Sequence, residues 1–286
     1  MTTSTRAWPQ RDRQWWAWIA AAVVAAMVCW SALGLGARWG RLPSAPADLY
    51  TIGRLMVTSL TWDDLSKCVE AMWDSIAIAW VGTLVAAVFA IPLAFVAAEN
   101  LVPGWLSFGV RQVLNVLRAI PEIILVMVLI PIFGLTPTAG ILAIGIGSIG
   151  TLGKLCAESV ESIDPGPIEA VDATGASKVQ RLRWAVIPQS MPEIASFVLY
   201  RFEINIRVST ILGAVGAGGI GQVVDDGLTT AVPRDWGLAG LALIIIVLAT
   251  VIVDFVSGAV RRRILAGPSG TARVTEEPAI VAEALL

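Results

Sequence analysis

Long stretches without a single charged residue constrain this 286-residue chain more than any other feature of its sequence. One stretch runs from Trp15 to Ala37 and another from Ile123 to Gly153, whereas about 20 apolar residues suffice for a helix to cross a bilayer. Only 15% of all residues are charged and 56% are hydrophobic. Soluble domains carry about 25% charged residues, and a soluble fold of this size could not bury so many apolar side chains. The sequence therefore predicts an all-α integral membrane protein.

Six membrane-spanning helices account for the apolar segments. The run that starts at Ile123 is too long for one helix, and Gly134-Leu135-Thr136-Pro137 is its natural break. We expect the first span at 15–37 and five more within a core at 75–263, at about 75–98, 111–133, 138–158, 191–214 and 236–253. Residues 38–74 are expected to form a loop outside the cytoplasm with a short amphipathic helix, and Trp62-Asp63-Asp64 is typical of a helix start.

The positive charges predict an orientation in the cell membrane. Positively charged residues favour the cytoplasmic side, and three clusters must share a side if there are six spans: Arg6, Arg11 and Arg13; Lys178, Arg181 and Arg183; and Arg261, Arg262 and Arg263. We therefore expect both termini, including residues 1–14 and a disordered tail at 264–286, to be cytoplasmic. The positive residues of the first loop count against this orientation: Arg38, Arg41, Arg54 and Lys67.

Several kinds of chemistry are excluded by composition. There is no histidine, which removes Ser-His-Asp triads and histidine-ligated metals. Cys29, Cys68 and Cys156 are far apart and lack metal-ligand spacing, so we expect no metal site. The net charge of −2 does not suggest nucleic-acid binding. The glycine-rich run 216–221 matches the residue pattern of a dinucleotide-binding fingerprint. That fingerprint requires a preceding strand, whereas this run follows a membrane span, so we reject a dinucleotide site here.

The polar segment at 161–189 separates the fourth and fifth spans. Asp164 is placed to cap a helix and Pro165 to occupy its first position. Apolar residues and one glycine then recur at spacings of 3, 4, 4 and 3, which predicts one face of a single amphipathic helix: Ile168, Val171, Gly175, Val179 and Leu182. Periodicity alone leaves two interpretations open, a helix that rests on lipid headgroups and a helix that docks to a partner protein.

A family resemblance favours the docking interpretation. The run Glu169-Ala170-Val171-Asp172-Ala173-Thr174-Gly175, with Pro188 thirteen residues after the glycine, resembles the cytoplasmic EAA loop of ABC import permeases. Departures from that motif are Val171, Ala185 and Ile187, all small apolar exchanges. The resemblance implies the type I importer permease fold and a coupling helix that contacts a separate ATPase subunit, which would carry the ATP and Mg. It assigns this coupling role to Glu169, Ala170, Asp172, Gly175 and Pro188.

A finer resemblance concerns the cargo. Five stretches are together similar to the phosphonate-import permease subfamily, over roughly 75–262: 148–150, 153–155, 164–167, 200–205 and 213–221. This implies phosphonate or a related oxyanion such as phosphate or phosphite as cargo, a second copy of the chain, two ATPase subunits and an extracytoplasmic binding protein. The glycine cluster also occurs in methionine-type permeases, so an amino-acid importer is the nearest alternative. An intramembrane hydrolase and a bare membrane scaffold are alternatives of other classes.

Polar residues within the fifth span are candidates for a translocation path, because charges inside a bilayer usually face a bundle interior or water. They are Arg201, Glu203, Asn205 and Arg207. Glu203 and Arg207 are four residues apart, so they either pair with each other or line the path, whereas Arg201 is expected to contact an anion or another span. We also expect Arg118 to pair with Glu122 beside Pro121.

The glycines that follow the fifth span have two interpretations, a gate or a simple turn into the last loop. The candidates are Gly213, Gly216, Gly218 and Gly219.

Overall fold

The computed structural model describes residues 15–34, 39–231 and 233–266, and every regular element in these ranges is helical. The expected N-terminus at 1–14 and most of the expected tail lie outside the described residues. The chain divides into two compact units after Ile52. The first unit holds α1 (Trp15–Gly34), the short η1 (Trp39–Arg41) and the first part of α2 (Ala45–Thr58). α1 buries no residue and is apolar on all sides, as expected of a helix surrounded by lipid.

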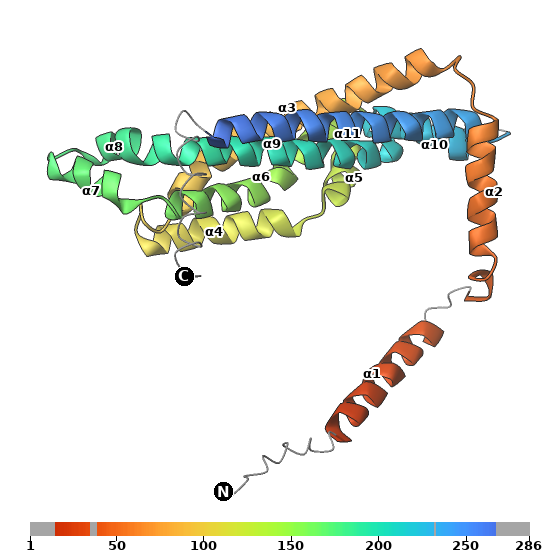
Figure 1. The fold of residues 1–286 in the computed structure, drawn as a ribbon, viewed down its shortest axis with the longest axis horizontal. Coiled ribbons are helices and arrows are strands. Elements are labelled where there is room, and N and C mark those ends of the chain that lie inside the picture. The colour runs from red at the N-terminus through yellow and green to blue at the C-terminus, as the bar shows by residue number, and fades with distance from the viewer. Residues whose placement is uncertain (1–14, 35–38, 232, 267–286) are drawn as a thin grey trace, which may run out of the picture. The chain divides into compact units, whose positions relative to one another are not determined.

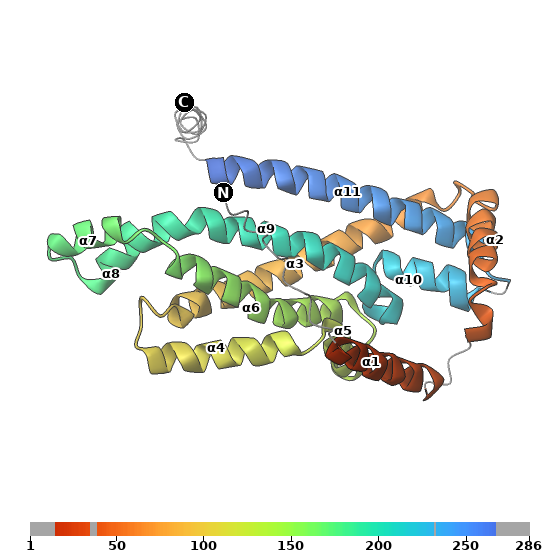
Figure 2. The same cartoon turned by 60° about the horizontal axis from the view of Figure 1, so that its bottom comes forward.

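The second unit is a helical bundle built around α6 (Pro137–Glu161). α6 packs against α3 (Leu65–Ala97), α4 (Gly104–Ala119), α5 (Glu122–Phe133) and α9 (Ile187–Leu212), and Figures 1 and 2 show it among them. Small residues allow the close approach that is typical of helices in membranes. A Cβ atom at Gly82 of α3 would lie 2.8 Å from Cγ2 of Ile144.

α11 (Trp236–Ala266) completes the bundle by packing on α9 and α3. At its N-terminal end it meets the residues around the end of α2, where a Cβ at Gly237 would clash with the carbonyl oxygen of Ser59. α3 begins at Leu65 rather than near residue 75, with Asp64 at the N-cap position. The helix start predicted from Trp62-Asp63-Asp64 is therefore confirmed, but the helix that begins there is the 33-residue α3, which also contains the second span expected from residue 75.

Two of the predicted spans are bent. The span expected at 111–133 is not one straight helix, because α4 and α5 meet at an angle of 81° around Ile120 and Pro121, although together they still form one candidate span. Proline has no N–H and disfavours helical backbone at the preceding residue. The second bend, of 60°, separates α9 and the π-helical turn η3 (Gly213–Ala217) from α10 (Ile220–Asp225) and η4 (Asp226–Thr230).

Four helices in the described ranges are long and apolar enough to cross a membrane, and there are six candidate spans if each bent pair counts as one. Between α6 and α9 the chain forms α7 (Pro165–Ala173), α8 (Lys178–Arg181) and the π-helical turn η2 (Leu182–Val186). α7 and α8 lie at the end of the bundle where α3 ends and α4 begins, whereas α10 lies at the opposite end (Figures 1 and 2).

Candidate functional site

α7 begins as its sequence predicts. Oδ1 of Asp164 accepts a hydrogen bond from the backbone N–H of Gly166 at 2.9 Å, and Pro165 occupies the first helical position. Gln189 at the start of α9 closes the base of this segment. Its side-chain oxygen accepts from the N–H of Asp164 at 3.2 Å, and its Nε2 donates to the carbonyl oxygen of Ala185 at 2.9 Å. Gln189 therefore connects the residue before α7 to the start of α9.

The single amphipathic helix predicted from Ile168 to Leu182 is wrong. α7 ends at Ala173, and Gly175 adopts φ +73°, a left-handed conformation that favours glycine and ends helices. A second short helix then begins at Ser177, whose hydroxyl forms a capping box with Gln180. Across the turn, Nη1 of Arg181 donates to Oδ2 of Asp172 at 3.2 Å. The segment is thus a helical hairpin, called here the α7–α8 hairpin (165–181).

The outer surface of the α7–α8 hairpin is exposed. Glu169 and Ala170 are exposed, and Glu169 forms no hydrogen bond or ion pair with any described residue. Val179 and Trp184 are 74% and 66% exposed, although both are large and apolar. A shallow groove of about 400 Å³ is lined by Ala170, Val171, Thr174, Ala176, Gln180 and Trp184. Sequence reasoning missed Trp184; its position within a polar, positively charged segment was the available signal.

Pro188 lies exposed in the first turn of α9, directly after η2. Because η2 runs into α9 without a break in helical backbone, a displacement of the hairpin would be transmitted to α9. All five predicted coupling residues thus lie at one end of the bundle, in the α7–α8 hairpin or at the start of α9.

Arg201 of α9 is buried and bonds to two neighbouring helices of the bundle. Its Nη2 donates to Oε1 of Glu122 on α5 at 2.6 Å, and its Nε donates to Oγ of Ser148 on α6 at 2.9 Å. Arg201 therefore contacts other spans, one of the two outcomes expected for it. The predicted Arg118–Glu122 pair is wrong, because Glu122 pairs with Arg201 and the side chain of Arg118 is exposed.

Asn205 extends the same polar network towards α3. It is 0% exposed, its Nδ2 donates to Oγ1 of Thr83 at 2.9 Å, and its Oδ1 accepts from Oγ of Ser148 at 3.2 Å. Thr83 in turn donates to the carbonyl oxygen of Ala79 at 2.6 Å. This network joins α3, α5, α6 and α9 with its main donors and acceptors paired, as buried polar groups require.

The predicted pairing of Glu203 with Arg207 is wrong. Nη2 of Arg207 donates to Oδ2 of Asp254 on α11 at 2.6 Å, and Oε1 of Glu203 lies 3.5 Å from Nη2 of Arg261. The helical spacing of four is correct, but both side chains lie beside α11 and find partners there. Sequence reasoning did not single out Asp254.

The glycine run after α9 forms a tight reversal. Gly216, Gly218 and Gly219 adopt φ of +99°, +83° and +76°. A Cβ atom at Gly221 would clash with the carbonyl oxygen of Thr210, so α10 packs on α9 through bare backbone. The N–H of Ile220 donates to Oγ of Ser75 on α3 at 2.9 Å. This reversal agrees with the interpretation of the glycine run as a turn. A gate at Gly213, Gly216, Gly218 and Gly219 stays a prediction.

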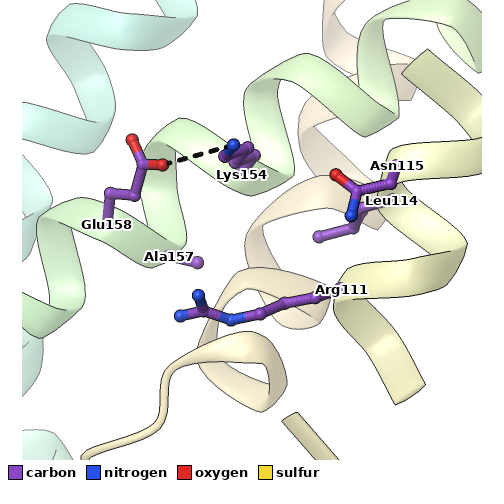
Figure 3. Close-up of a pocket in the computed structure, with 6 residues that line it drawn as sticks. All are labelled: Arg111, Leu114, Asn115, Lys154, Ala157 and Glu158. Atoms are coloured by element: carbon purple, nitrogen blue, oxygen red, sulfur yellow. Dashed lines mark ion pairs between the residues drawn. The ribbon is translucent and has the colours of Figure 1, made fainter. Parts of the chain in front are cut away.

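A small pocket of about 90 Å³ lies between α4 and α6 (Figure 3) and is lined by Arg111, Leu114, Asn115, Lys154, Ala157 and Glu158. Its charges are already paired. Lys154 Nζ lies 3.7 Å from Oε1 of Glu158, and Arg111 pairs with Glu161 and donates from Nε to the carbonyl oxygen of Ala97 at 3.0 Å. Arg111 therefore holds α4 against α3 and α6 at this pocket. Within the described ranges, no group of three or more cysteine or acidic residues could hold a metal ion.

These features together define a class. A helical bundle with up to six candidate spans, a buried polar network and an exposed helical hairpin at one end is typical of a multi-pass membrane protein. The chain belongs to the family of binding-protein-dependent transport system inner membrane components, which matches residues 90–266. It is accordingly a transport subunit of the inner membrane and not an enzyme.

Curated relatives place the chain within that family. It is 40% identical over 195 residues to the phosphite transport system permease protein PtxC of Stutzerimonas stutzeri, and the match covers 68% of this chain and 70% of that protein. It is 41% identical over 193 residues to the phosphate-import permease protein PhnE of Mycolicibacterium smegmatis, covering 67% of this chain and 36% of that longer protein.

The fold has a solved counterpart. A chain of the inward-facing MetNI methionine ABC transporter is 22% identical, with a TM-score of 0.64, and the match covers 72% of this chain and 99% of that chain. This likeness shows the fold, which is the type I ABC importer permease fold predicted above.

Proposed function

We propose that this chain is the membrane permease subunit of an ATP-driven importer that moves phosphite, phosphonate or phosphate into the cell. The observation that carries the cargo class is the 40% identity to a phosphite permease over 68% of the chain. A putative phosphite permease, HtxC of Stutzerimonas stutzeri, supports it at 36% identity over 71% of the chain. The family description supports delivery by an extracytoplasmic binding protein.

The energy source is a separate ATPase subunit that docks on the α7–α8 hairpin. Three features support this docking surface: the exposed carboxylate of Glu169, which no described residue pairs, the exposed indole of Trp184, and the groove that Trp184 lines with Gln180. An exposed aromatic side chain in a groove is typical of the centre of a protein interface. ATP and Mg belong to the ATPase subunit.

The working assembly contains two copies of this chain and two ATPase subunits, with both termini and the hairpin in the cytoplasm. The clusters of positive residues at Arg261-Arg262-Arg263 and at Lys178, Arg181 and Arg183 support this orientation. The rotation or tilting of α9 that follows ATPase closure would change access to the bundle interior, because η2 joins the hairpin to α9 without a break.

Methionine import is the alternative cargo assignment. A probable D-methionine permease, MetI of Vibrio cholerae, is 28% identical over 41% of this chain, which is lower and shorter than the match to the phosphite permease. The cargo is tested by growth of a strain that lacks its other phosphorus importers on phosphite or a phosphonate as sole phosphorus source. Growth should require this chain, and growth that is equal with and without the chain would contradict the proposal.

A further inference from the structure

A seam of charged side chains runs between α9 and α11 and differs from the buried network around Arg201. We call it the α9–α11 seam, and it consists of Glu203, Arg207, Asp254, Ser257 and Arg261. The side chains of Arg207 and Asp254 are 53% and 39% exposed, whereas that of Arg201 is 9% exposed. The guanidinium of Arg207 therefore has donors that the described bundle leaves open to a ligand.

Exposed apolar side chains lie near the Arg207–Asp254 ion pair on both helices. On α11 its neighbours Val251 and Phe255 are 60% and 75% exposed, and on α9 Ile211 is 58% exposed. A charged side chain that faces hydrocarbon lowers the stability of a membrane-inserted helix. An ion pair this exposed would lower the stability of the inserted protein unless its open side faces water or a polar ligand.

Three polar atoms of the seam have unused hydrogen-bonding capacity. Oε1 of Glu203, Oδ1 of Asp254 and Oγ of Ser257 are buried and have no hydrogen-bond partner among the described residues. Glu203 is 8% exposed and Ser257 is 5% exposed, and the 3.5 Å separation of Glu203 from Arg261 is too long or poorly aligned for a hydrogen bond. Buried polar atoms without partners are expected to bind water or another ligand.

We propose that Arg207 is the exchangeable contact for the cargo oxyanion during transport, and that Asp254 occupies its guanidinium when no cargo is present. This inference rests on the proposed function. A guanidinium offers a planar fork of donors that matches two oxygens of phosphite, phosphonate or phosphate. The carboxylate of Asp254 presents the same pair of oxygens, so the cargo replaces one anion by another and the cation is never left unpaired in the membrane.

Exchange with Asp254 also explains how the contact avoids trapping the cargo. A cation without a competing anion would hold the oxyanion tightly and slow its release, whereas a tethered carboxylate restores the resting pair as the cargo leaves. Arg201 does not fit this role because its side chain is only 9% exposed and its Nε and Nη2 already donate to Ser148 and Glu122 inside the bundle.

A charge-swap series separates a cargo contact from a structural ion pair. We expect Arg207→Gln to lower phosphite uptake at least tenfold, and Asp254→Asn to lower the phosphite concentration for half-maximal uptake while slowing the maximal rate. The double variant Arg207→Asp with Asp254→Arg restores an ion pair but moves the cation to α11. Uptake should stay low in the double variant although its amount in the membrane is normal. Uptake restored to the wild-type rate would overturn the proposal.

A second measurement does not depend on transport. In a Cys29→Ser background, Asp254→Cys and the exposed apolar control Val251→Cys are treated with a charged, water-soluble methanethiosulfonate reagent. We expect at least tenfold faster modification at position 254, and slower modification there when phosphite and the complete transporter are present. Equal rates at both positions would overturn the proposal. Failure of the cargo assignment itself is recognised separately, since the wild-type chain would then take up no phosphorus oxyanion.

Discussion

Arg201 of α9 and Glu122, the first residue of α5, form an ion pair of 2.6 Å between Nη2 and Oε1. The pair fastens the bent end of one span to the middle of another. α5 follows an 81° bend and is only 12 residues long; its apolar side chains pack on α6, and this ion pair adds a polar link to α9. Oγ of Ser148 accepts from the same guanidinium at 2.9 Å, which makes Arg201 the hub that links α5, α6 and α9.

Removal of this hub should destabilise the protein. Arg201→Ala leaves the carboxylate of Glu122 without its partner, and breaking a largely buried ion pair costs about 3 kcal/mol. The thermal midpoint of the detergent-purified protein should fall by several degrees. Lys154→Ala is the matched control, because its pair with Glu158 is exposed and such pairs contribute about 1 kcal/mol or less. Equal midpoints for both variants would contradict this account of Arg201.

The close packing of α10 on α9 should not tolerate a side chain at residue 221. Gly221→Ala drives a Cβ into the carbonyl oxygen of Thr210, and relief of such a clash requires backbone movement that costs about 3 kcal/mol or more. We expect a strong decrease in the amount of folded protein in the membrane. Gly109→Ala is the control, since nothing lies within 4 Å of its Cβ and alanine favours a helix. Normal levels of Gly221→Ala would refute the tight reversal after α9.

The turn of the α7–α8 hairpin should determine how well the ATPase binds. A Cβ at Gly175 has open space around it, but the φ of +73° is strained for any other residue by roughly 1–2 kcal/mol. Gly175→Ala should therefore weaken co-purification of the ATPase about fivefold or more without loss of the membrane subunit. Gly104→Ala, also in open space but without positive φ, should bind the ATPase normally. Equal binding by the two variants would rule out a role for the turn.

Glu169 should act on the ATPase and not on the fold. Because it contacts no described residue through a hydrogen bond or ion pair, Glu169→Ala should leave the thermal midpoint of the isolated chain unchanged. ATP hydrolysis stimulated by the loaded binding protein should fall at least severalfold in the reconstituted complex. The exposed Gln222, on α10 at the other end of the bundle, supplies the control variant Gln222→Ala. Wild-type stimulation in Glu169→Ala would exclude this residue from coupling.

Features that depend on neighbouring residues could be predicted from the sequence. Asp164 caps α7 and Pro165 follows it, because both signals act within one turn. The start of α3 at Leu65 could also be predicted, from the run that ends at Asp64. The apolar stripe through Gly175 led to the wrong prediction of one continuous helix. The spacing of its apolar residues fits a single helix although a turn separates α7 from α8. A glycine after Thr174 was the opposing signal, typical of a helix end.

Partners across the bundle could not be predicted. Sequence spacing offers only pairs three or four residues apart, so Glu203 was assigned to Arg207 and Glu122 to Arg118. The structure instead pairs Arg207 with Asp254, which is 47 residues away, and Glu122 with Arg201, which is 79 residues away. Such pairs follow from the packing of helices that are far apart in the sequence, which no local pattern contains.

The central claim is that ATP hydrolysis by a separate subunit drives a phosphorus oxyanion through this chain. Its most direct test is uptake of radiolabelled phosphite, phosphate or methylphosphonate by proteoliposomes that hold this chain and its ATPase, with the binding protein outside and ATP at the ATPase. We predict that uptake of at least one oxyanion exceeds the ATP-free level at least tenfold. Uptake that is the same with and without ATP, or ATP-driven uptake of methionine instead, would contradict the claim.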